Sequence, residues 1–523
     1  MRVSASIWSQ CLNRLLGTTR GISPPGRAGQ RRRAKRHNVC AAEVMESREL
    51  LSATFGDALS IGNDTGGTIA FDVATDAAGN SYMTGSFSGT VDFDETATVH
   101  PGDTDILTAR GTNDAYVVKY APDNTLLWVQ RMGGDAASVS TGTTDVGRQI
   151  AIDGSSNVYV VGEFTGVADF GSTILSTVGT DKDGFVVKFN AGGTILWAKD
   201  WGSSSDDFGK GIDVDGTGNV YVLGLRDVGP NYNYTITYDH DILKYSPTGA
   251  SVWSKSIATK TGSSSANLVV DVTGNAFVAG SFRGTVDFDP STKTKNVSSG
   301  PSYSAFVLKL TTQGKLGWVS PFVGQTVNST NGYSTAQSVA LDGSGNIAVA
   351  GYYGGSVDFN PGSGTTTLPG LPGASAIQGA FITKLNSTGG LLWARGLAGD
   401  SSTHAWGLDV DSAGSIYATG SFYGTVDLDP GAGSVLRTTA GNGDIFVVKL
   451  TAAGNYSWAE TFGGTGLDIG FGIAVDATGS VHLAGRYFGM VDFDPASTHD
   501  GDTDILTTAG TYSNAFRLWL EQV

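Results

Sequence analysis

A lysine followed nine residues later by a tryptophan is the feature that most constrains how this chain can fold. The pair occurs six times, although the interval between successive lysines varies from 56 to 75 residues. A fixed spacing inside a variable repeat indicates that both residues belong to one hairpin that accepts no insertion. The six pairs are Lys119 and Trp128, Lys188 and Trp197, Lys244 and Trp253, Lys309 and Trp318, Lys384 and Trp393, and Lys449 and Trp458.

The sequence around each pair is typical of two β-hairpins. Alternating apolar residues, as at 183–189, lead into a glycine-containing turn and then into a tryptophan strand, as at 195–198. A second hairpin precedes this one, as at 472–485, and its turn reads Asp-x-x-Gly-Asn or Asp-x-x-Gly-Ser. Glycine supplies a positive φ there, while Asn or Ser caps the turn. Each repeat is therefore predicted to hold four antiparallel strands.

The number of repeats follows from these turns. They begin at Asp76, Asp153, Asp215, Asp271, Asp342, Asp411 and Asp476, and the copy at Asp153 is a variant. The last repeat ends in a third strand at 515–520, and residues 51–56 can be aligned with the fourth strand at 458–463. A strand from the N-terminus would close the ring and remove its exposed edges.

The sequence therefore predicts an all-β fold, a seven-bladed β-propeller of four-stranded antiparallel blades whose last blade is closed by an N-terminal strand. We assign 1–42 to a basic disordered leader, 43–55 to an export-type motif and the closing strand, and 56–523 to the propeller.

Charge and composition exclude several classes of function. The first 42 residues hold nine of the 33 Lys and Arg, so the remainder holds 24 against 49 Asp and Glu. So acidic a body should repel phosphate backbones, and no nucleic-acid partner is expected. Both cysteines, Cys11 and Cys40, precede the repeats, which excludes a disulfide or a catalytic thiol within them. No apolar run is long enough for a transmembrane helix.

The repeat resembles a known family. The run Gly-Asn-x-Tyr-x-x-Gly-x-Phe-x-Gly at 79–89, with the later Phe-Val-x-Lys and Trp strands, resembles the bacterial seven-bladed β-propeller (SBBP) repeat. The resemblance extends over 50–523 and implies an extracellular or envelope propeller without a defined activity. Repeat three departs from the pattern at 225–227, so we expect an irregular blade there.

The leader lacks the apolar core of an ordinary secretory signal. Residues 45–52, however, resemble the Leu-Glu-Pro-Arg and Leu-Leu (LEPR-XLL) segment near the start of many exported planctomycete proteins, with Met45 and Ser47 in place of the usual Leu and Pro. This resemblance implies an extracellular or cell-surface location. The alternatives are a solvated basic tail on a cytoplasmic protein and nonspecific attraction of the tail to nucleic acid.

Paired aspartates open the long connection between the second and third strands of several repeats. The element Gly-Thr-Val-Asp-Phe-Asp or a close variant supplies Asp92 and Asp94, Asp287 and Asp289, Asp427 and Asp429, and Asp492 and Asp494, with Asp358 and Asn360 as a weakened copy. Two carboxylates on one side of an extended chain could give Ca²⁺ part of its oxygen ligands. Alternatively, they cap turns by accepting hydrogen bonds from backbone N–H groups. Both interpretations remain open.

The first and last copies are the best supplied with further carboxylates. Asp103 and Asp105 follow the first pair, and Asp502 and Asp504 follow the last. These copies would lie in neighbouring blades of a closed ring, so blades 1 and 7 are the preferred cation sites.

The sequence contains no familiar catalytic motif. A nucleophile elbow, a His-Glu-x-x-His helix and a phosphate loop are all missing. His240, between Asp239 and Asp241, is expected in a solvated loop. The repeated lysines and tryptophans are expected to be structural, the lysines paired with carboxylates and the tryptophans packed between blades.

These observations favour an exported, noncatalytic propeller scaffold that binds a protein or a polysaccharide at the cell surface through its long loops. One alternative is a carbohydrate-active hydrolase or lyase that uses loop carboxylates. Another is a structural component of an envelope layer.

Overall fold

The computed structural model describes residues 53–62, 66–94, 105–134, 143–230, 236–261, 266–368, 377–494, 505–508 and 512–522. Within these ranges the chain forms strands and turns and no helix, and so contains no helix that could cross a membrane. The leader and the export-type segment at 45–52 lie outside the described residues.

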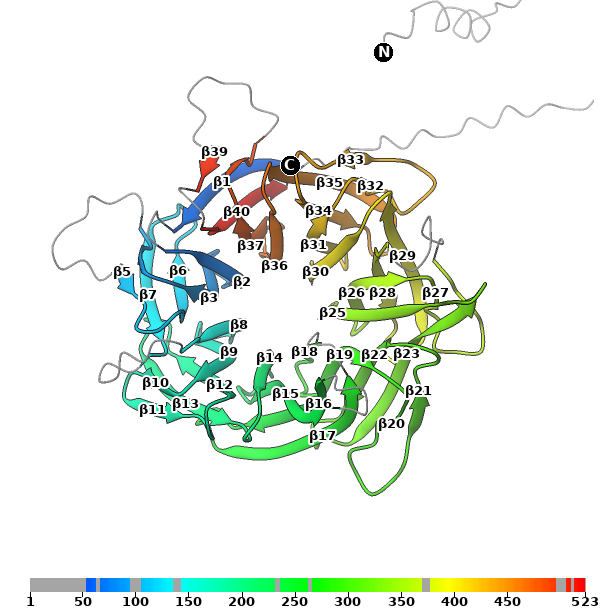
Figure 1. The fold of residues 1–523 in the computed structure, drawn as a ribbon, viewed down its shortest axis with the longest axis horizontal. Coiled ribbons are helices and arrows are strands. Elements are labelled where there is room, and N and C mark those ends of the chain that lie inside the picture. The colour runs from blue at the N-terminus through cyan, green and yellow to red at the C-terminus, as the bar shows by residue number, and fades with distance from the viewer. Residues whose placement is uncertain are drawn as a thin grey trace, which may run out of the picture. The chain divides into compact units, whose positions relative to one another are not determined.

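The described strands form seven four-stranded antiparallel sheets, set around a centre as the blades of a propeller (Figure 1). Each blade presents its first strand to the centre and its fourth to the rim, which confirms the predicted fold. Blade 1 consists of β2 (Thr68–Thr75), β3 (Ser81–Phe87), β6 (Asp114–Tyr120) and β7 (Leu126–Met132), and blade 2 of β8 (Val146–Ile152), β9 (Val158–Thr165), β12 (Lys182–Phe189) and β13 (Ile195–Trp201). Blade 3 consists of β14 (Asp207–Val214), β15 (Val220–Pro230), β16 (Ile236–Tyr245) and β17 (Ser251–Thr261), and blade 4 of β18 (Ala266–Val270), β19 (Ala276–Phe282), β22 (Ser304–Leu310) and β23 (Leu316–Val327). Blade 5 consists of β25 (Tyr333–Leu341), β26 (Ile347–Gly354), β28 (Gly379–Leu385) and β29 (Leu391–Gly399), and blade 6 of β30 (Thr403–Val410), β31 (Ile416–Phe422), β34 (Asp444–Leu450) and β35 (Tyr456–Gly464). Blade 7 consists of β36 (Ile469–Val475), β37 (Val481–Tyr487), β40 (Asn514–Gln522) and β1 (Ala53–Ile61).

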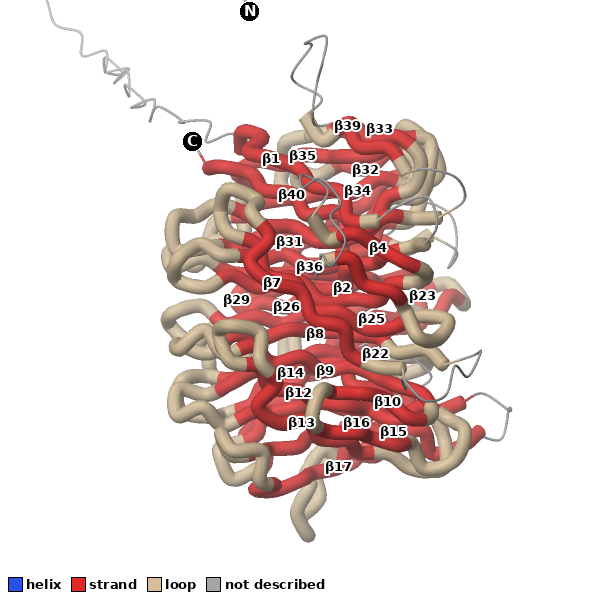
Figure 2. The backbone as a smooth tube through the Cα atoms, turned by 90° about the vertical axis from the view of Figure 1, so that its left-hand side faces the viewer, coloured by secondary structure: helices blue, strands red, loops and turns tan. Residues whose placement is uncertain are grey.

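The connections between second and third strands carry short strands of their own. Three of these strands pair with the fourth strand of the preceding blade and so fasten one blade to the next: β27 with β23, β32 with β29 and β38 with β35. In a side view, the short turns lie along one side of the ring and these connections along the other (Figure 2). The short strands of these connections are β4 (Thr90–Asp92), β5 (Ile106–Thr108), β10 (Val167–Phe170), β11 (Thr173–Ser176), β20 (Thr285–Asp287), β21 (Asn296–Ser298), β27 (Ser356–Asp358), β32 (Thr425–Asp427), β33 (Leu436–Thr438), β38 (Met490–Asp492) and β39 (Ile505–Thr507). A further short strand, β24 (Thr330–Asn331), pairs with β23 between blades 4 and 5.

Blade 3 departs from this plan, as expected. Its strands β15, β16 and β17 are ten or eleven residues long, and the ladder of β15 with β16 is irregular between Asp227 and Pro230.

The hydrophobic core lies between the blades. The second and third strands are apolar on both faces because each face packs against a neighbouring blade, as β3 and β6 show by being buried throughout. Tyr82 and Val117 of blade 1, for example, share one cluster with Val160 and Phe185 of blade 2. Burying a side chain such as Phe185 contributes about 1.5–3 kcal/mol, so each blade depends on its neighbours for stability.

The repeated lysine and tryptophan lie directly opposite each other on the hairpin of the third and fourth strands in all six blades that carry them. This cross-strand pairing explains their fixed spacing. Four of the lysines reach the aspartate of the first turn in their own blade: Lys119 to Asp76 at 3.6 Å, Lys244 to Asp215 at 3.7 Å, Lys384 to Asp342 at 2.9 Å and Lys449 to Asp411 at 3.9 Å. Lys188 instead donates to the carbonyl of Pro247, and Lys309 lies over the ring of Phe277.

The tryptophans join consecutive blades. Five indole N–H groups donate to a carbonyl in the turn between the third and fourth strands of the following blade: Trp128 to Ala191, Trp197 to Pro247, Trp253 to Thr312, Trp318 to Ser387 and Trp393 to Ala452, at 3.0 to 3.2 Å. Trp458 faces blade 7, whose third and fourth strands come from opposite ends of the chain and share no such turn. Its indole N–H is buried without a partner among the described residues.

The first turn of each blade has the predicted geometry. The Asp76 side chain accepts hydrogen bonds from the backbone N–H of Ala78 and Asn80, both at 3.0 Å, while Gly79 adopts a φ of 78°. In the variant turn at Asp153, Ser156 takes the glycine position with a φ of 56°.

Strand β1 pairs antiparallel with β40 and completes blade 7, which confirms closure by an N-terminal strand. The predicted register was wrong. In blade 6, Phe462 pairs with Ile445. The residue of blade 7 equivalent to Ile445 is Ala515, which pairs with Ile61 and not with Phe55. The closing strand thus runs from Ala53 to Ile61, beyond the predicted boundary at 55. The wrong alignment arose because residues 54–56 have the same Thr-Phe-Gly sequence as residues 461–463 of blade 6. Strand β1 also lacks the tryptophan that marks the register of the fourth strand in the other six blades.

Pairs of buried aspartates meet at three junctions between blades. One member starts a third strand and the other stands at the start of the first strand of the next blade: Asp114 with Asp145, Asp183 with Asp207, and Asp444 with Asp468. Burial, with a smaller contribution from the partner carboxylate, raises the pKa of Asp145 to about 7 and those of Asp207 and Asp444 to about 6. At two other junctions both positions are uncharged, with Ser304 and Ser334 in one and Asn514 and Thr68 in the other.

The first of these pairs has a close counter-ion. Arg131 donates to Asp114 at 2.8 Å, whereas Thr461 occupies the corresponding position in blade 6. The Oδ1 atom of Asp444 is buried and has no hydrogen-bond partner among the described residues. The Asp444 pair should therefore favour the folded state only while it retains a proton.

We expect Asp444→Asn to raise the free energy of unfolding by about 1 kcal/mol near pH 8 and to change it little near pH 4. A carboxyl whose pKa is raised by folding destabilises the folded state progressively as the pH rises from its ordinary pKa of 3.8 to the folded pKa, here about 6, and asparagine removes that loss. Urea denaturation at the two pH values measures it. In contrast, Asp114→Asn should destabilise at both pH values because it deprives Arg131 of its partner. Destabilisation by Asp444→Asn near pH 8 would contradict this account.

Candidate functional site

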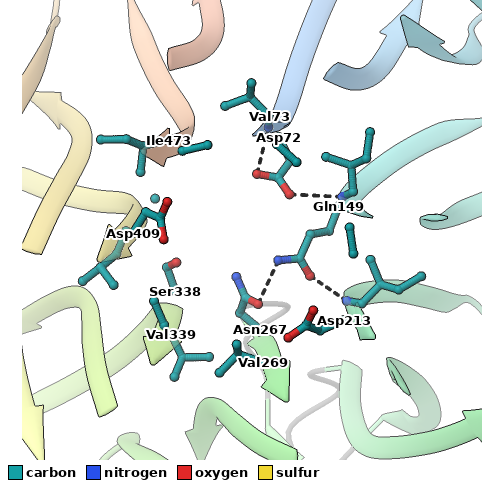
Figure 3. Close-up of a pocket in the computed structure, with 18 of the residues that line it drawn as sticks. Asp72, Val73, Gln149, Asp213, Asn267, Val269, Ser338, Val339, Asp409 and Ile473 are labelled. Carbon is teal, nitrogen blue, oxygen red and sulfur yellow. Dashed lines mark hydrogen bonds between the residues drawn. The ribbon is translucent and has the colours of Figure 1, made fainter. Parts of the chain in front are cut away.

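The first strands of all seven blades line a central cavity of about 540 Å³ (Figure 3). In six of the seven described first strands one residue bulges from the ladder, and each of these six residues lines the cavity: Phe71, Arg148, Lys210, Gln337, Trp406 and Phe471. Strand β18 has no bulge and presents Asn267. A bulge leaves its extra residue outside the ladder and redirects the side chain. The backbone geometry therefore repeats around the channel, while the six side chains are of five different types.

A small residue precedes each bulge. It is Ala70, Gly147, Gly209, Ala336, Ala405 or Gly470, all buried. At Gly147 an added Cβ would lie 2.1 Å from Oγ1 of Thr84 in the preceding blade, so a larger residue cannot fit without moving that blade. A repeated Ala or Gly followed by a residue that does not repeat is thus the sequence signal that could have located this channel.

The channel is aromatic over blades 6, 7 and 1. The ring centroid of Phe471 lies 6.4 Å from that of Trp406 and 5.4 Å from that of Phe71. We call these three residues the aromatic arc. Tyr352 and His404 pack against Trp406, and burial lowers the pKa of His404 to about 4, so this histidine is neutral at neutral pH.

The channel is cationic over blades 2 and 3. Arg148 donates from Nε to both carboxylate oxygens of Glu163 at 3.0 Å, and its guanidinium carbon lies 4.5 Å from the ring centroid of Phe71. Burial raises the pKa of Glu163, but the charges of Arg148, Lys210 and Lys182 outweigh it and hold the pKa below its usual value. Three cations therefore surround one carboxylate.

Lys210 lacks a close partner. Its ammonium lies 4.9 Å from the ring centroid of Phe208, and among the described residues no carboxylate oxygen forms an ion pair with it within 4.0 Å. Burial lowers its pKa to about 8, since the charges of Arg148 and Lys182 offset the attraction of Glu163.

Three aspartates also line the channel, but each uses both oxygens to hold backbone. Asp72 accepts from Val73 at 3.0 Å and, in the next blade, from Ile150 at 3.1 Å. Asp213 and Asp409 likewise accept from their following residue and from the next blade, at 2.7 to 2.8 Å. Burial raises the pKa of Asp72 to about 7 and those of the other two to about 6. These carboxyl groups act as ties between blades.

Gln149 makes a fourth tie. Its side chain accepts from the backbone N–H of Ile212 at 2.6 Å and donates to Asn267 at 3.0 Å, which links blades 2, 3 and 4 (Figure 3).

The paired aspartates predicted from the sequence cap turns. In each of the four copies Oδ1 of the first aspartate accepts from the backbone N–H of the second: Asp92 from Asp94 at 2.9 Å, Asp287 from Asp289 at 3.1 Å, Asp427 from Asp429 at 3.1 Å and Asp492 from Asp494 at 2.9 Å. The residue between the two is buried in every copy. Each pair belongs to its own blade, so the structure does not gather them into one site.

The cation interpretation of these pairs stays a prediction. Blades 1 and 7 are neighbours, as predicted, but Asp103, Asp502 and Asp504 lie outside the described residues. Within the described part of the chain, no three His, Cys, Asp or Glu side chains are grouped to hold a metal ion.

The expectation for His240 was wrong. It lies within β16, is 1% exposed and packs against Phe306 with ring centroids 5.4 Å apart. Its Nδ1 contacts Oγ1 of Thr259 at 2.7 Å, and burial lowers its pKa to about 3. Apolar packing against blade 4 thus overrides the two flanking carboxylates.

No protein-family model matches the chain. A curated relative, the uncharacterized WD repeat-containing protein L264 of Acanthamoeba polyphaga mimivirus, is 24% identical over 446 residues, which cover 70% of this chain and 31% of the viral protein. The chain therefore spans about a third of that relative's length.

Similar solved structures include a Dyadobacter fermentans protein of unknown function, with 10% identity, 90% of this chain and 99% of that chain covered, and a TM-score of 0.37. The Neurospora crassa Pan2 WD40 domain is 12% identical, with 90% of this chain and 98% of that chain covered and a TM-score of 0.37. A DUF4221 family member from Bacteroides vulgatus is 9% identical, with 90% of this chain and 99% of that chain covered and a TM-score of 0.32.

We expect Asp427→Ala to lower the free energy of unfolding by about 1–2 kcal/mol. The change removes the acceptor of two backbone N–H groups, those of Asp429 and of Val435 at 2.8 Å. Urea denaturation measures the loss. Asp427→Asn, which keeps a side-chain acceptor, should lose less, and equal losses in both variants would show that turn capping is not what the residue supplies.

The calcium prediction is tested by thermal unfolding of the purified chain in EDTA and in millimolar Ca²⁺. A ligand that binds the folded state alone raises the midpoint. If the pairs bind Ca²⁺, the midpoint rises in the wild type and not in the Asp92→Ala, Asp94→Ala variant. An unchanged midpoint in the wild type rejects the cation role.

Proposed function

We propose that this protein is an exported, noncatalytic propeller of the SBBP type that binds a protein or polysaccharide at the cell surface, and that the mouth of its central channel is the binding site. One observation carries the proposal: the six bulge residues share a backbone geometry but not a side-chain type. In a repeat fold, residues that hold the repeats together recur, as the lysines and tryptophans do. Side chains that vary on a fixed frame are free to serve recognition.

The cavity has the character of a binding site. Its volume of about 540 Å³ falls within the range of ~300–1,000 Å³ found for ligand pockets. It combines an apolar aromatic surface with a few charged and amide groups, the mixture that gives affinity together with specificity. The channel aspartates favour this binding role over hydrolysis, since both oxygens of each already accept backbone hydrogen bonds.

Capture of partners from the native envelope fraction tests the site. The wild-type chain should retain a partner that the double variant Trp406→Ala, Phe471→Ala loses, because these changes remove two of the three aromatic-arc rings. Leu127→Ala, Leu392→Ala is the matched control, since these leucines are 47% and 49% exposed on fourth strands. Thermal unfolding confirms that all three proteins fold. Equal retention by the wild type and the channel variant would reject the channel as the site.

Export is tested separately by fractionating cells that express the full chain. The proposal requires the protein in the extracellular or envelope fraction, and it requires residues 45–52 for this location. Retention of the wild type in the cytoplasm rejects export. Incubation with a polysaccharide panel tests catalysis, and turnover that is lost on changing an aspartate would replace binding by an enzymatic role.

A further inference from the structure

The chemistry of the channel wall narrows the kind of partner it can take. Outside the first 42 residues the chain holds 24 Lys and Arg against 49 Asp and Glu, yet Arg148, Lys182 and Lys210 gather around the single carboxylate of Glu163. Buried cations are normally matched by anions, because desolvation is costly without a partner. At this cluster three cations therefore face one carboxylate, while the channel aspartates Asp72, Asp213 and Asp409 are occupied in holding backbone N–H groups.

Lys210 is the cation available to a ligand. Glu163 is engaged by the guanidinium of Arg148, which also lies against Phe71. Lys210 lines the cavity, and among the described residues its ammonium has the ring of Phe208 and the more distant Glu163 to stabilise it. A carboxylate entering the channel would form a charge-assisted hydrogen bond there, in surroundings of low polarity that strengthen it.

Phe71 places apolar surface beside this charge. It contacts Arg148 on one side and Phe471 of the aromatic arc on the other. A ligand with a carboxylate next to an aromatic or apolar group would therefore meet both walls at once. Gln337 also lines the cavity and adds an amide that can pair with a peptide group.

The geometry of the aromatic arc favours a polypeptide over a polysaccharide. The ring planes of Phe71 and Phe471 are inclined by 45°, and those of Trp406 and Phe471 by 59°. Rings inclined to one another in this way present no continuous flat face, whereas they can contact a side chain from more than one direction. A sugar ring would stack better on a flat exposed aromatic face.

We propose that the channel mouth binds an acidic polypeptide segment in which a carboxylate neighbours an aromatic side chain, with the carboxylate on Lys210 and the aromatic group on the arc of Trp406, Phe471 and Phe71. This inference rests on the proposed function and specifies the ligand of the same site.

The test uses the full chain and a random copolymer of glutamate and tyrosine, with binding followed by isothermal titration calorimetry. Poly-glutamate, poly-lysine and polygalacturonate are the comparison probes. The copolymer should bind more tightly than poly-glutamate, whereas poly-lysine, which the acidic surface attracts, should bind equally to the wild type and to Lys210→Gln. Lys210→Gln should weaken copolymer binding by about tenfold or more. Lys199→Gln, the same change at an exposed position on β13, should leave it unchanged.

The pH dependence separates Lys210 from a general attraction to positive charge. Glu163, Arg148 and Lys182 are the charged groups that face Lys210. Copolymer affinity should fall as the pH rises above about 8, where the ammonium loses its proton. Lys210→Arg remains charged in this range and should keep its affinity.

The outcomes distinguish this inference from the function on which it rests. Equal weakening by Lys210→Gln and Lys199→Gln, or tighter binding of polygalacturonate than of the copolymer, overturns the acidic-polypeptide assignment. If capture of the native partner still depends on Trp406 and Phe471 in that case, the proposed function stands. If capture does not depend on them, both fail.

Discussion

The whole structure depends on the burial of each blade between two others. The middle strands are apolar on both faces, so a blade on its own would expose the residues that make the core, and a row of blades would leave two such faces open at its ends. Closing the ring removes both ends, and the pairing of β1 with β40 makes that closure cooperative with the fold of blade 7. Loops, channel and rim have fixed positions only because the ring is closed.

The sequence was sufficient for those features that one blade determines alone. Lys119 and Trp128 stand opposite each other on one hairpin, so their spacing is visible in the sequence and repeats with it. The register of the closing strand could not be predicted in the same way. Its true partners stand more than 450 residues away, as Ile61 and Ala515 do, and the local match at Phe55 gave a competing alignment.

The candidate site could not be predicted because its residues share position and not identity. Phe71, Arg148 and Gln337 have unrelated side chains, so only the bulges in the structure show that they occupy the same position in their blades. Contacts between blades are hidden for a related reason: Asp444 and Asp468 become partners only when one blade is placed on the next. His240 shows the converse, since its neighbours in sequence suggested solvent and its neighbours in space exclude it.

The bulges bear on how such a protein can change over time. A bulged residue contributes no pair to the ladder, and its side chain opens onto the channel, so exchanging it leaves in place the strand register and the backbone hydrogen bonds that Asp72, Asp213 and Asp409 accept between blades. The steric constraint applies instead to the preceding Ala or Gly, which must stay small. The ring thus provides six positions of low constraint that converge on one cavity. New specificities can arise there by single substitutions while the fold is inherited unchanged, much as variable loops diversify on a constant framework.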